Sequence, residues 1–280
     1  MLLLEGCQEC HGSAVMDDGA AIIAEAISLE NLSEHASKFC AHAAVRRRYA
    51  NAAIENGKPI LDAVPFLLST AKWRDEWRVD SMLTDAHLLS FENELQAVLL
   101  YSLSVDERER PLLIERVGAW NVSTLLATVS AHSEDVLRAH VLVTERIRLA
   151  VDAAAVRGSE GGVDPRAVCV FDTAGMPWSL LRQPSLLSHF AQTARLDAAH
   201  FPDTMGTIII VNVSRVAKAM WWLIAPLIAP QTRQKVHVFS WSQEAQAHAM
   251  LRELCGVGAL PAELGGRQER GSLAYRHDCL

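Results

Sequence analysis

The sequence predicts an α/β fold, in which a mixed, mostly parallel sheet of about five strands is flanked by helices and preceded by a small all-helical domain. Residues 21–90 are expected to be helical, because segments such as FLLSTAKWRDEW mix apolar and charged residues at helical spacing. Further along the chain, short apolar runs alternate with amphipathic segments, which is typical of βαβ units. The first two of these runs are joined by a charged turn, which predicts an antiparallel hairpin at the start of the sheet.

Five apolar runs supply the predicted strands. AVLLYSL and PLLIERV form the hairpin around SVDERER, and AVCVFDTAG is a strand that ends in a turn. TIIIVNV is apolar on successive residues, as expected of a strand that is covered on both faces. KVHVFS is the last strand. In chain order, these runs occupy residues 97–103, 111–117, 167–175, 207–213 and 235–240.

Helices are predicted between the later strands. Ser133 is expected to cap a long amphipathic helix, whose apolar positions recur every three or four residues as far as Val151. Residues 158–165 form a loop, a second helix surrounds Phe190, and a third covers residues 243–254.

Length and composition limit the organisation of the chain. With 280 residues, half of them hydrophobic, it can bury one large core or one core with a small helical companion. The net charge of -7 argues against a nucleic-acid binder. We find neither a signal peptide nor a transmembrane segment, and therefore expect residence in the cytoplasm. The expected regions are a loose tail (1–20), a helical domain (21–90), an α/β domain (91–266) and a C-terminal tail (267–280).

Motifs that would indicate chemistry are isolated in this sequence. CQECH at residues 7–11 fits the haem attachment pattern, but we interpret it as a chance match in a loose tail. VCVFDTAG is similar to one element of small GTPases, but there is no phosphate-binding loop to accompany it. The histidines form no close-spaced set of metal ligands, and His140 is expected to be a packed core residue. We therefore predict no metal, no cofactor and no catalysis.

The run AMWWLIAPLIAP at residues 219–230 is the feature that these patterns leave unexplained. Every residue from Ala219 to Ile224 is apolar, and Pro226 ends the helix. A helix that is apolar all round is either fully buried or meets a non-aqueous phase. Adjacent tryptophans also suit a membrane interface. Two interpretations stay open here, namely full burial and a short mobile helix that covers an apolar cavity and dips into a bilayer.

The C-terminal half resembles the CRAL-TRIO lipid-binding domain, the fold of the phosphatidylinositol/phosphatidylcholine transfer proteins. AKWRDEW (71–77) is similar to the end of the small helical domain that precedes it in the family. Together the similar segments cover roughly residues 45–266. The resemblance is carried by five motifs in the family's order: RPLLIERVGAWN (110–121), VCVFDTAGM (168–176), FPDTMGTIIIVNV (201–213), MWWLIAPLIAPQTRQKVHVF (220–239) and LPAELGG (260–266).

The resemblance implies one hydrophobic ligand in a pocket between the sheet and a gate helix. The gate residues implied in this way are Met220, Trp221, Trp222, Leu223, Ile224 and Leu227. The pocket lining implied in the same way is Val170, Phe171, Ile208 and Ile210.

Head-group residues are also implied by the resemblance. Asp203, Thr232 and Lys235 match the Glu, Thr and Lys that engage the inositol phosphate in phosphoinositide-binding members. Ser179 matches one of the two polar residues that hold a choline head group. The family's basic stretch in the N-terminal domain is reduced here to Arg48, so a lipid carrier is better supported than any particular lipid.

The sequence thus indicates a cytosolic, monomeric lipid-binding or lipid-transfer protein that is not an enzyme. It would hold one ligand, a phospholipid such as phosphatidylinositol, and exchange it at membrane surfaces to which it binds peripherally. Two alternatives stay open. One is a non-catalytic docking module for a protein partner, and the other is a carrier of a different apolar ligand, such as a tocopherol, retinoid, sterol precursor or haem.

Overall fold

The computed structural model describes residues 10–27, 32–157, 164–228 and 230–269. The chain divides into two compact units, one up to Asp80 and one from Ser81 onward. We had expected this division at residues 90–91, which instead lie inside a helix of the second unit. In the described part of the chain, no helix is both long enough and apolar enough to cross a membrane.

The first unit is all-helical. Its core surrounds the fully buried side chains of Ile23, Tyr49 and Leu67. Ser33 caps the second helix, where its side chain accepts a hydrogen bond from the backbone N–H of Ala36 at 3.0 Å. The first helix begins within the segment that we expected to be a loose tail. The helices are α1 (Cys10–Ala26), α2 (Glu34–Ala41), α3 (Ala43–Glu55), η1 (Ile60–Asp62) and α4 (Ala63–Trp77), and α5 (Val79–Met82) runs across the boundary between the units.

The second unit contains a five-stranded sheet with the strand order β1-β2-β3-β4-β5. The first two strands are antiparallel, and the other neighbouring pairs are parallel. This arrangement confirms the predicted mixed, mostly parallel sheet with an antiparallel hairpin at its start. The strands are β1 (Tyr101–Val105), β2 (Pro111–Glu115), β3 (Ala167–Asp172), β4 (Met205–Val213) and β5 (Val236–Ser240).

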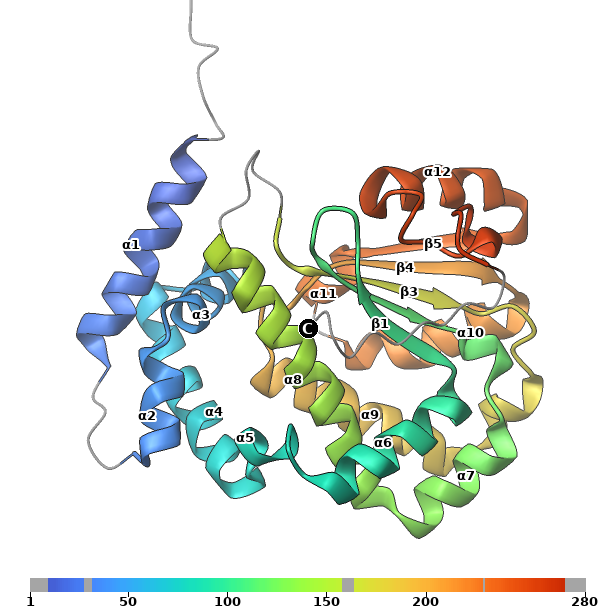
Figure 1. The fold of residues 1–280 in the computed structure, drawn as a ribbon, viewed down its shortest axis with the longest axis horizontal. Helices are drawn as coiled ribbons and strands as arrows, with labels where there is room; N and C mark the ends of the chain where they lie inside the picture. Colours follow the sequence, from blue (N-terminus) through green and yellow to red (C-terminus); the bar gives the residue numbers. More distant parts are fainter. Residues whose placement is uncertain (1–9, 28–31, 158–163, 229, 270–280) are drawn as a thin grey trace, which may run out of the picture. The chain divides into compact units, whose positions relative to one another are not determined.

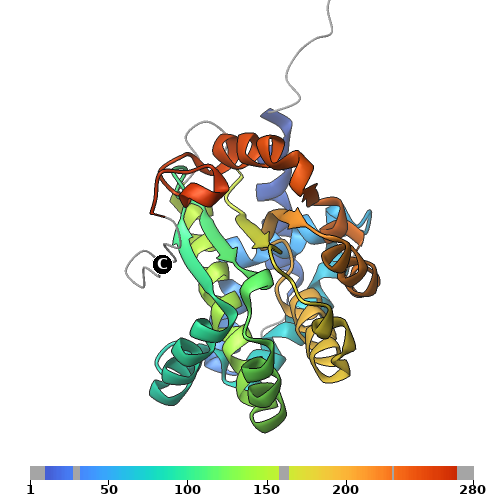
Figure 2. The same ribbon diagram turned by 90° about the vertical axis from the view of Figure 1, so that its right-hand side faces the viewer.

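Helices lie on both sides of this sheet, with α12 on one side and α8, α9 and α10 on the other (Figures 1 and 2). The parallel crossovers all step in the same direction along the sheet, so right-handed connections place their helices on one face. The helical elements are α6 (Ala86–Leu99), η2 (Val117–Ala119), α7 (Val122–Ala131), α8 (Ser133–Arg157), η3 (Trp178–Arg182), α9 (Pro184–His200), α10 (Arg215–Ile224), η4 (Ala225–Leu227), α11 (Pro230–Gln234), η5 (Trp241–Gln243), α12 (Glu244–Cys255) and η6 (Ala262–Leu264).

The start of the hairpin differs from the sequence prediction. We expected the first strand at residues 97–103, but α6 continues to Leu99 and β1 begins at Tyr101. Leu100 has a φ of 51°, and this left-handed residue ends the helix. A short apolar run such as AVLL fits a helix as well as a strand, so periodicity alone does not separate the two.

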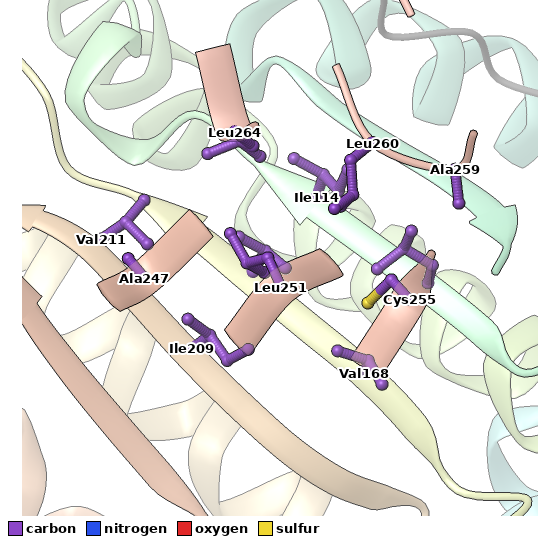
Figure 3. Packing of buried hydrophobic residues seen from close by; sticks show 12 residues of the cluster. Ile114, Val168, Ile209, Val211, Ala247, Leu251, Cys255, Ala259, Leu260 and Leu264 are labelled. Carbon is purple, nitrogen blue, oxygen red and sulfur yellow. The ribbon is translucent and has the colours of Figure 1, made fainter. Parts of the chain in front are cut away.

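The two faces of the sheet have different cores. On the α12 face, Leu112, Ile114, Val168, Val170, Ile209 and Val211 pack against α12, where Ala247, Leu251 and Cys255 point toward the strands (Figure 3). On the α8 face, the buried residues of the strands and of α8 are Tyr101, Leu103, Leu113, Ile147, Val151, Ala167 and Cys169. We refer to these two surfaces below as the α12 face and the α8 face.

Candidate functional site

The carboxyl-terminal half of the α8 face carries a row of incompletely covered side chains. Strand register aligns Glu115, Phe171, Ile210 and Val238 side by side on this face. The first three are half-buried, and Val238 is exposed. Apolar surface that the protein itself leaves partly uncovered is suited to a ligand.

Three of the four side chains expected to line a pocket lie on this face, but Val170 does not. Phe171, Ile208 and Ile210 are half-buried on the α8 face. Val170 belongs to the core under α12 and is fully buried there. Successive residues of a strand point to opposite faces, so neighbours such as Val170 and Phe171 cannot line the same pocket.

The predicted gate segment forms α10, which has one buried and one exposed side. Ser214 caps the helix by accepting a hydrogen bond from the N–H of Ala217 at 3.3 Å. Met220 is buried, while Trp222 and Leu223 expose 70% and 51% of their surface. The helix packs against β4 and η3. Arg215 and Lys218 are exposed in its first turn, but the exposed side of its carboxyl-terminal half is apolar, which a purely structural crossover helix would not require.

The remaining gate residues are neither fully buried nor exposed where the structure describes them. Trp221 and Ile224 are half-buried. Leu227 belongs to η4, but its side chain lies outside what the structure describes.

The predicted inositol phosphate residues come together at the amino ends of β4 and β5. The ammonium nitrogen of Lys235 lies 3.6 Å from Oδ1 of Asp203, and both side chains are largely buried. The backbone N–H of Lys235 donates to the carbonyl oxygen of Thr232 at 3.1 Å. A positive charge and a carboxylate therefore meet at one edge of the sheet, and Thr232 lies three residues before Lys235 in the adjoining turn.

Ser179 does not belong to this group. It lies in η3, which follows the carboxyl end of β3, and it is exposed. Asp203 and Lys235 lie at the opposite, amino-terminal edge of the parallel strands. Since a strand rises about 3.3 Å per residue, roughly 20 Å of sheet separates the two edges.

Arg166 is a member of this cluster that the sequence analysis missed. Its Nη1 donates to Oδ1 of Asp203 at 2.6 Å, and its Nη2 donates to Oδ2 of Asp164 at 2.7 Å. Burial lowers the pKa of Arg166, but the two carboxylates more than offset that effect, so the net shift is upward. The guanidinium thus stays charged and holds Asp203 in place beside Lys235.

A second polar cluster lies between the α8 face and the helices that cover it. Nε2 of His140 and Oδ1 of Asp197 are 2.8 Å apart, which links α8 to α9. Burial raises the pKa of Glu115 to about 7, against the opposing influence of His140 and Trp120. Burial also lowers the pKa of His140, but Asp197 and Glu115 raise it by more. We had expected His140 to be a packed core residue, so this cluster was also missed.

Neither cluster resembles a metal centre. Within the residues that the structure covers, there is no group of three or more His, Cys, Asp or Glu side chains that could hold a metal ion. Most of the CQECH motif, residues 7–9, lies outside the described residues, and no side chain of the motif is described.

Comparison with known proteins identifies the family. The family model described as the CRAL/TRIO domain matches residues 95–266, which is more than half of the chain. The chain therefore belongs to the CRAL/TRIO domain family, as the resemblance of the motifs had indicated. The solved structure of Sfh5 matches with a TM-score of 0.60 and 14% identity, covering 95% of this chain and 90% of that one. This likeness shows a shared fold.

Several relatives are named as lipid-transfer proteins. The phosphatidylinositol/phosphatidylcholine transfer protein SFH4 of Arabidopsis thaliana is 24% identical over 203 residues, which cover 70% of this chain and 31% of SFH4. Protein real-time of Anopheles gambiae is 26% identical over 211 residues, which cover 73% of this chain and 29% of that protein. The chain thus spans about a third of the length of these curated relatives.

Proposed function

We propose that this chain is a non-catalytic lipid-transfer protein, which holds one phospholipid such as phosphatidylinositol and exchanges it at membranes. The observation that carries the proposal is the two-sided character of α10. This helix buries Met220 toward the protein while it presents Trp222 and Leu223 to the outside. Membership of the CRAL/TRIO family and relatives named as phosphatidylinositol/phosphatidylcholine transfer proteins support the same function.

In this proposal, α10 is the gate. Its displacement at a bilayer lets the acyl chains reach the half-buried side chains of Phe171, Ile208 and Ile210. Each CH₂ group that leaves water contributes about 0.8 kcal/mol, which favours the bound lipid over a lipid in free solution. The bilayer interior offers a similar gain, so the exchange is reversible. The exposed indole of Trp222 suits the membrane interface.

The cluster at the amino ends of β4 and β5 would receive the head group. Lys235 supplies positive charge to the phosphate, and Thr232 supplies a hydroxyl. Asp203 accepts hydrogen bonds from inositol hydroxyls, and Arg166 holds this carboxylate in position. The protein would act as a cytosolic monomer that contacts membranes only peripherally.

Two measurements test this function. Native mass spectrometry of the purified protein, followed by organic extraction, should reveal one phospholipid per chain. In a vesicle-to-vesicle transfer assay, Trp222→Asp should slow transfer about tenfold, because a charge replaces the residue that enters the interface. The matched control is Val156→Asp on α8, at a position that is 71% exposed, and it should transfer normally. Equal transfer by both variants would contradict the gate.

A docking module for a protein partner is the second candidate. Trp178 of η3, which packs against α10, exposes 58% of its surface and extends the apolar surface of Trp222 and Leu223. This alternative predicts a stable protein complex and a chain that remains empty after incubation with mixed phospholipid vesicles.

A further inference from the structure

The polar groups at the carboxyl end of the α8 face are not explained by a hydrocarbon ligand. Glu115 is in register with Phe171 on β3 and, through it, with Ile210 on β4. An acyl chain lying on this row would therefore meet a carboxyl group. Hydrocarbon would remove this carboxyl group from water without offering it a hydrogen bond, which is unfavourable, so the ligand for this row requires a different chemistry.

A buried donor lies beside this acid. Among the described residues, no acceptor meets hydrogen-bonding geometry with the buried Nε1 of Trp120. The indole N–H nevertheless lies near enough to the Glu115 carboxyl to act on it as a hydrogen-bond donor of poor geometry, which lowers the pKa of that carboxyl. The Trp120 ring packs against Phe190 of α9, with 5.6 Å between the ring centroids, so its orientation is supported from the helix layer.

The turn that carries Trp120 is also fixed by the fold. An added Cβ on Gly118 would lie 2.0 Å from the carbonyl oxygen of Ala174, so the turn after β2 packs directly on the turn after β3. The N–H of Ala119 donates to the carbonyl oxygen of Arg116 at 2.9 Å. Trp120 therefore belongs to a rigid turn rather than to a free loop.

His140 and Asp197 complete the cluster and leave accessible surface. They hydrogen-bond each other, yet their side chains remain 30% and 38% accessible. This accessible part of the α8–α9 pair is available to a bound molecule. The two carboxyl groups make the cluster unfavourable for phosphate or carboxylate. A quaternary ammonium group has no oxygen that could accept from the Trp120 indole.

A hydroxyl group has the complementary chemistry. Its oxygen accepts from the Trp120 N–H, and its hydrogen is donated to the Glu115 carboxyl. We propose that the carboxyl end of the α8 face is a binding site for the hydroxyl group of an apolar ligand, held between Trp120 and Glu115, with the His140–Asp197 pair beside them. This site lies at the opposite edge of the parallel strands from Asp203 and Lys235, and goes beyond the proposed phospholipid transfer.

Two kinds of ligand supply such a hydroxyl, namely a long-chain alcohol and the inositol ring of a lipid. The test loads the full chain from cyclodextrin with an equal mixture of 1-hexadecanol and hexadecane, and the bound ratio is measured by gas chromatography after gel filtration. Trp120→Phe should lower the alcohol-to-alkane ratio about tenfold, which corresponds to about 1.4 kcal/mol. Trp241→Phe, at an exposed tryptophan of η5, is the control and should keep the wild-type ratio. Solubility differences between the two compounds cancel in this comparison of variants.

A measurement on the wild-type protein keeps the proposal testable if Trp120→Phe does not fold. In a ¹H–¹⁵N spectrum, one indole N–H resonance should move downfield on addition of hexadecanol and stay in place with hexadecane. An unchanged bound ratio in folded Trp120→Phe, or an indole signal that responds equally to both compounds, would overturn the proposal.

Phosphatidylinositol loading separates the two sources of the hydroxyl. If Trp120→Phe lowers hexadecanol binding and leaves phosphatidylinositol loading unchanged, the site serves a separate alcohol. If it lowers both, the inositol ring also occupies the site. Lys235→Ala tests the proposed phosphate-binding residues at the other edge of the sheet. If this variant loads phosphatidylinositol normally, the result counts against the proposed head-group site and not against the hydroxyl site at Trp120 and Glu115.

Discussion

The two faces of the sheet are built from similar apolar residues but are covered to different extents. Val170 and Ile209 on the α12 face are fully buried, whereas their strand neighbours Phe171 and Ile210 on the α8 face remain half-buried. The α12 face is covered by α12 and by Ala259, Leu260 and Leu264 of the segment that follows it (Figure 3). This difference in burial indicates that the side chains of the α12 face stabilise the fold, while the α8 face keeps apolar surface that a ligand can cover.

The largest expected effect follows from removing packing on the α12 face. Leu251→Ala leaves a cavity at a fully buried position and should lower the free energy of unfolding by about 2–5 kcal/mol. Ile210→Ala removes a similar volume from the α8 face and should cost about 1 kcal/mol, because this side chain is only partly buried. Urea denaturation of the lipid-free protein measures both changes. Equal losses would contradict the distinction between the faces.

The pH dependence of stability sharpens the comparison at Glu115. Burial raises the pKa of this carboxyl from 4.5 to about 7, so the folded state holds a proton that the unfolded chain releases. Its stabilising contribution is complete below pH 4.5 and is lost as the pH rises through 7, by at most about 3 kcal/mol. Glu115→Gln should remove this part of the decline. Unfolding free energies of both proteins at pH 5 and pH 8 provide the measurement.

His189 affects stability in the opposite direction and must be separated from Glu115. Burial lowers the pKa of His189 to about 4, with a smaller contribution from the charge of His140. The stabilising contribution of neutral His189 is present above pH 6.5 and is lost as the pH falls toward 4. The difference between wild type and Glu115→Gln cancels the contribution of His189 and reports on Glu115 together with His140, whose pKa Glu115 raises. Parallel pH profiles of the two proteins would show that folding does not raise the pKa of Glu115.

The smallest expected effect concerns a hydroxyl placed on each face. Val170→Thr buries a hydroxyl in the core under α12 and should cost about 1–2 kcal/mol. Val238→Thr changes a side chain that is 42% exposed and should stay within about 0.5 kcal/mol of wild type. Thermal unfolding of the two variants measures this contrast in stability. Equal losses of stability would contradict the difference in burial between the two positions.

Much of the architecture could be predicted from the spacing of apolar residues, because this spacing differs between strands and helices. The five strands and the antiparallel hairpin were confirmed for this reason. The direction in which each strand residue points could not be obtained in the same way. The run AVCVF at residues 167–171 is apolar at every position, so its pattern does not distinguish the α12 face from the α8 face. The misplacement of Val170 has this origin.

The candidate site depends more strongly on tertiary structure. Asp203 and Lys235 were found through motifs of the family, but Arg166 pairs with Asp203 across 37 residues and has no local signal. Glu115, His140 and Asp197 come from β2, α8 and α9, and no spacing in the sequence connects them. Contacts of this kind follow only after the helices have been placed on the sheet.

The placement of α12 has a consequence for how the protein is made. The strands that it seals end at residue 240, and the sealing helix spans Glu244–Cys255. During synthesis from the amino terminus, Val168, Ile209 and Leu112 emerge before any residue of the helix that covers them. The nascent sheet therefore carries a bare apolar face until its last helix arrives, and this interval is when chaperones would be most needed.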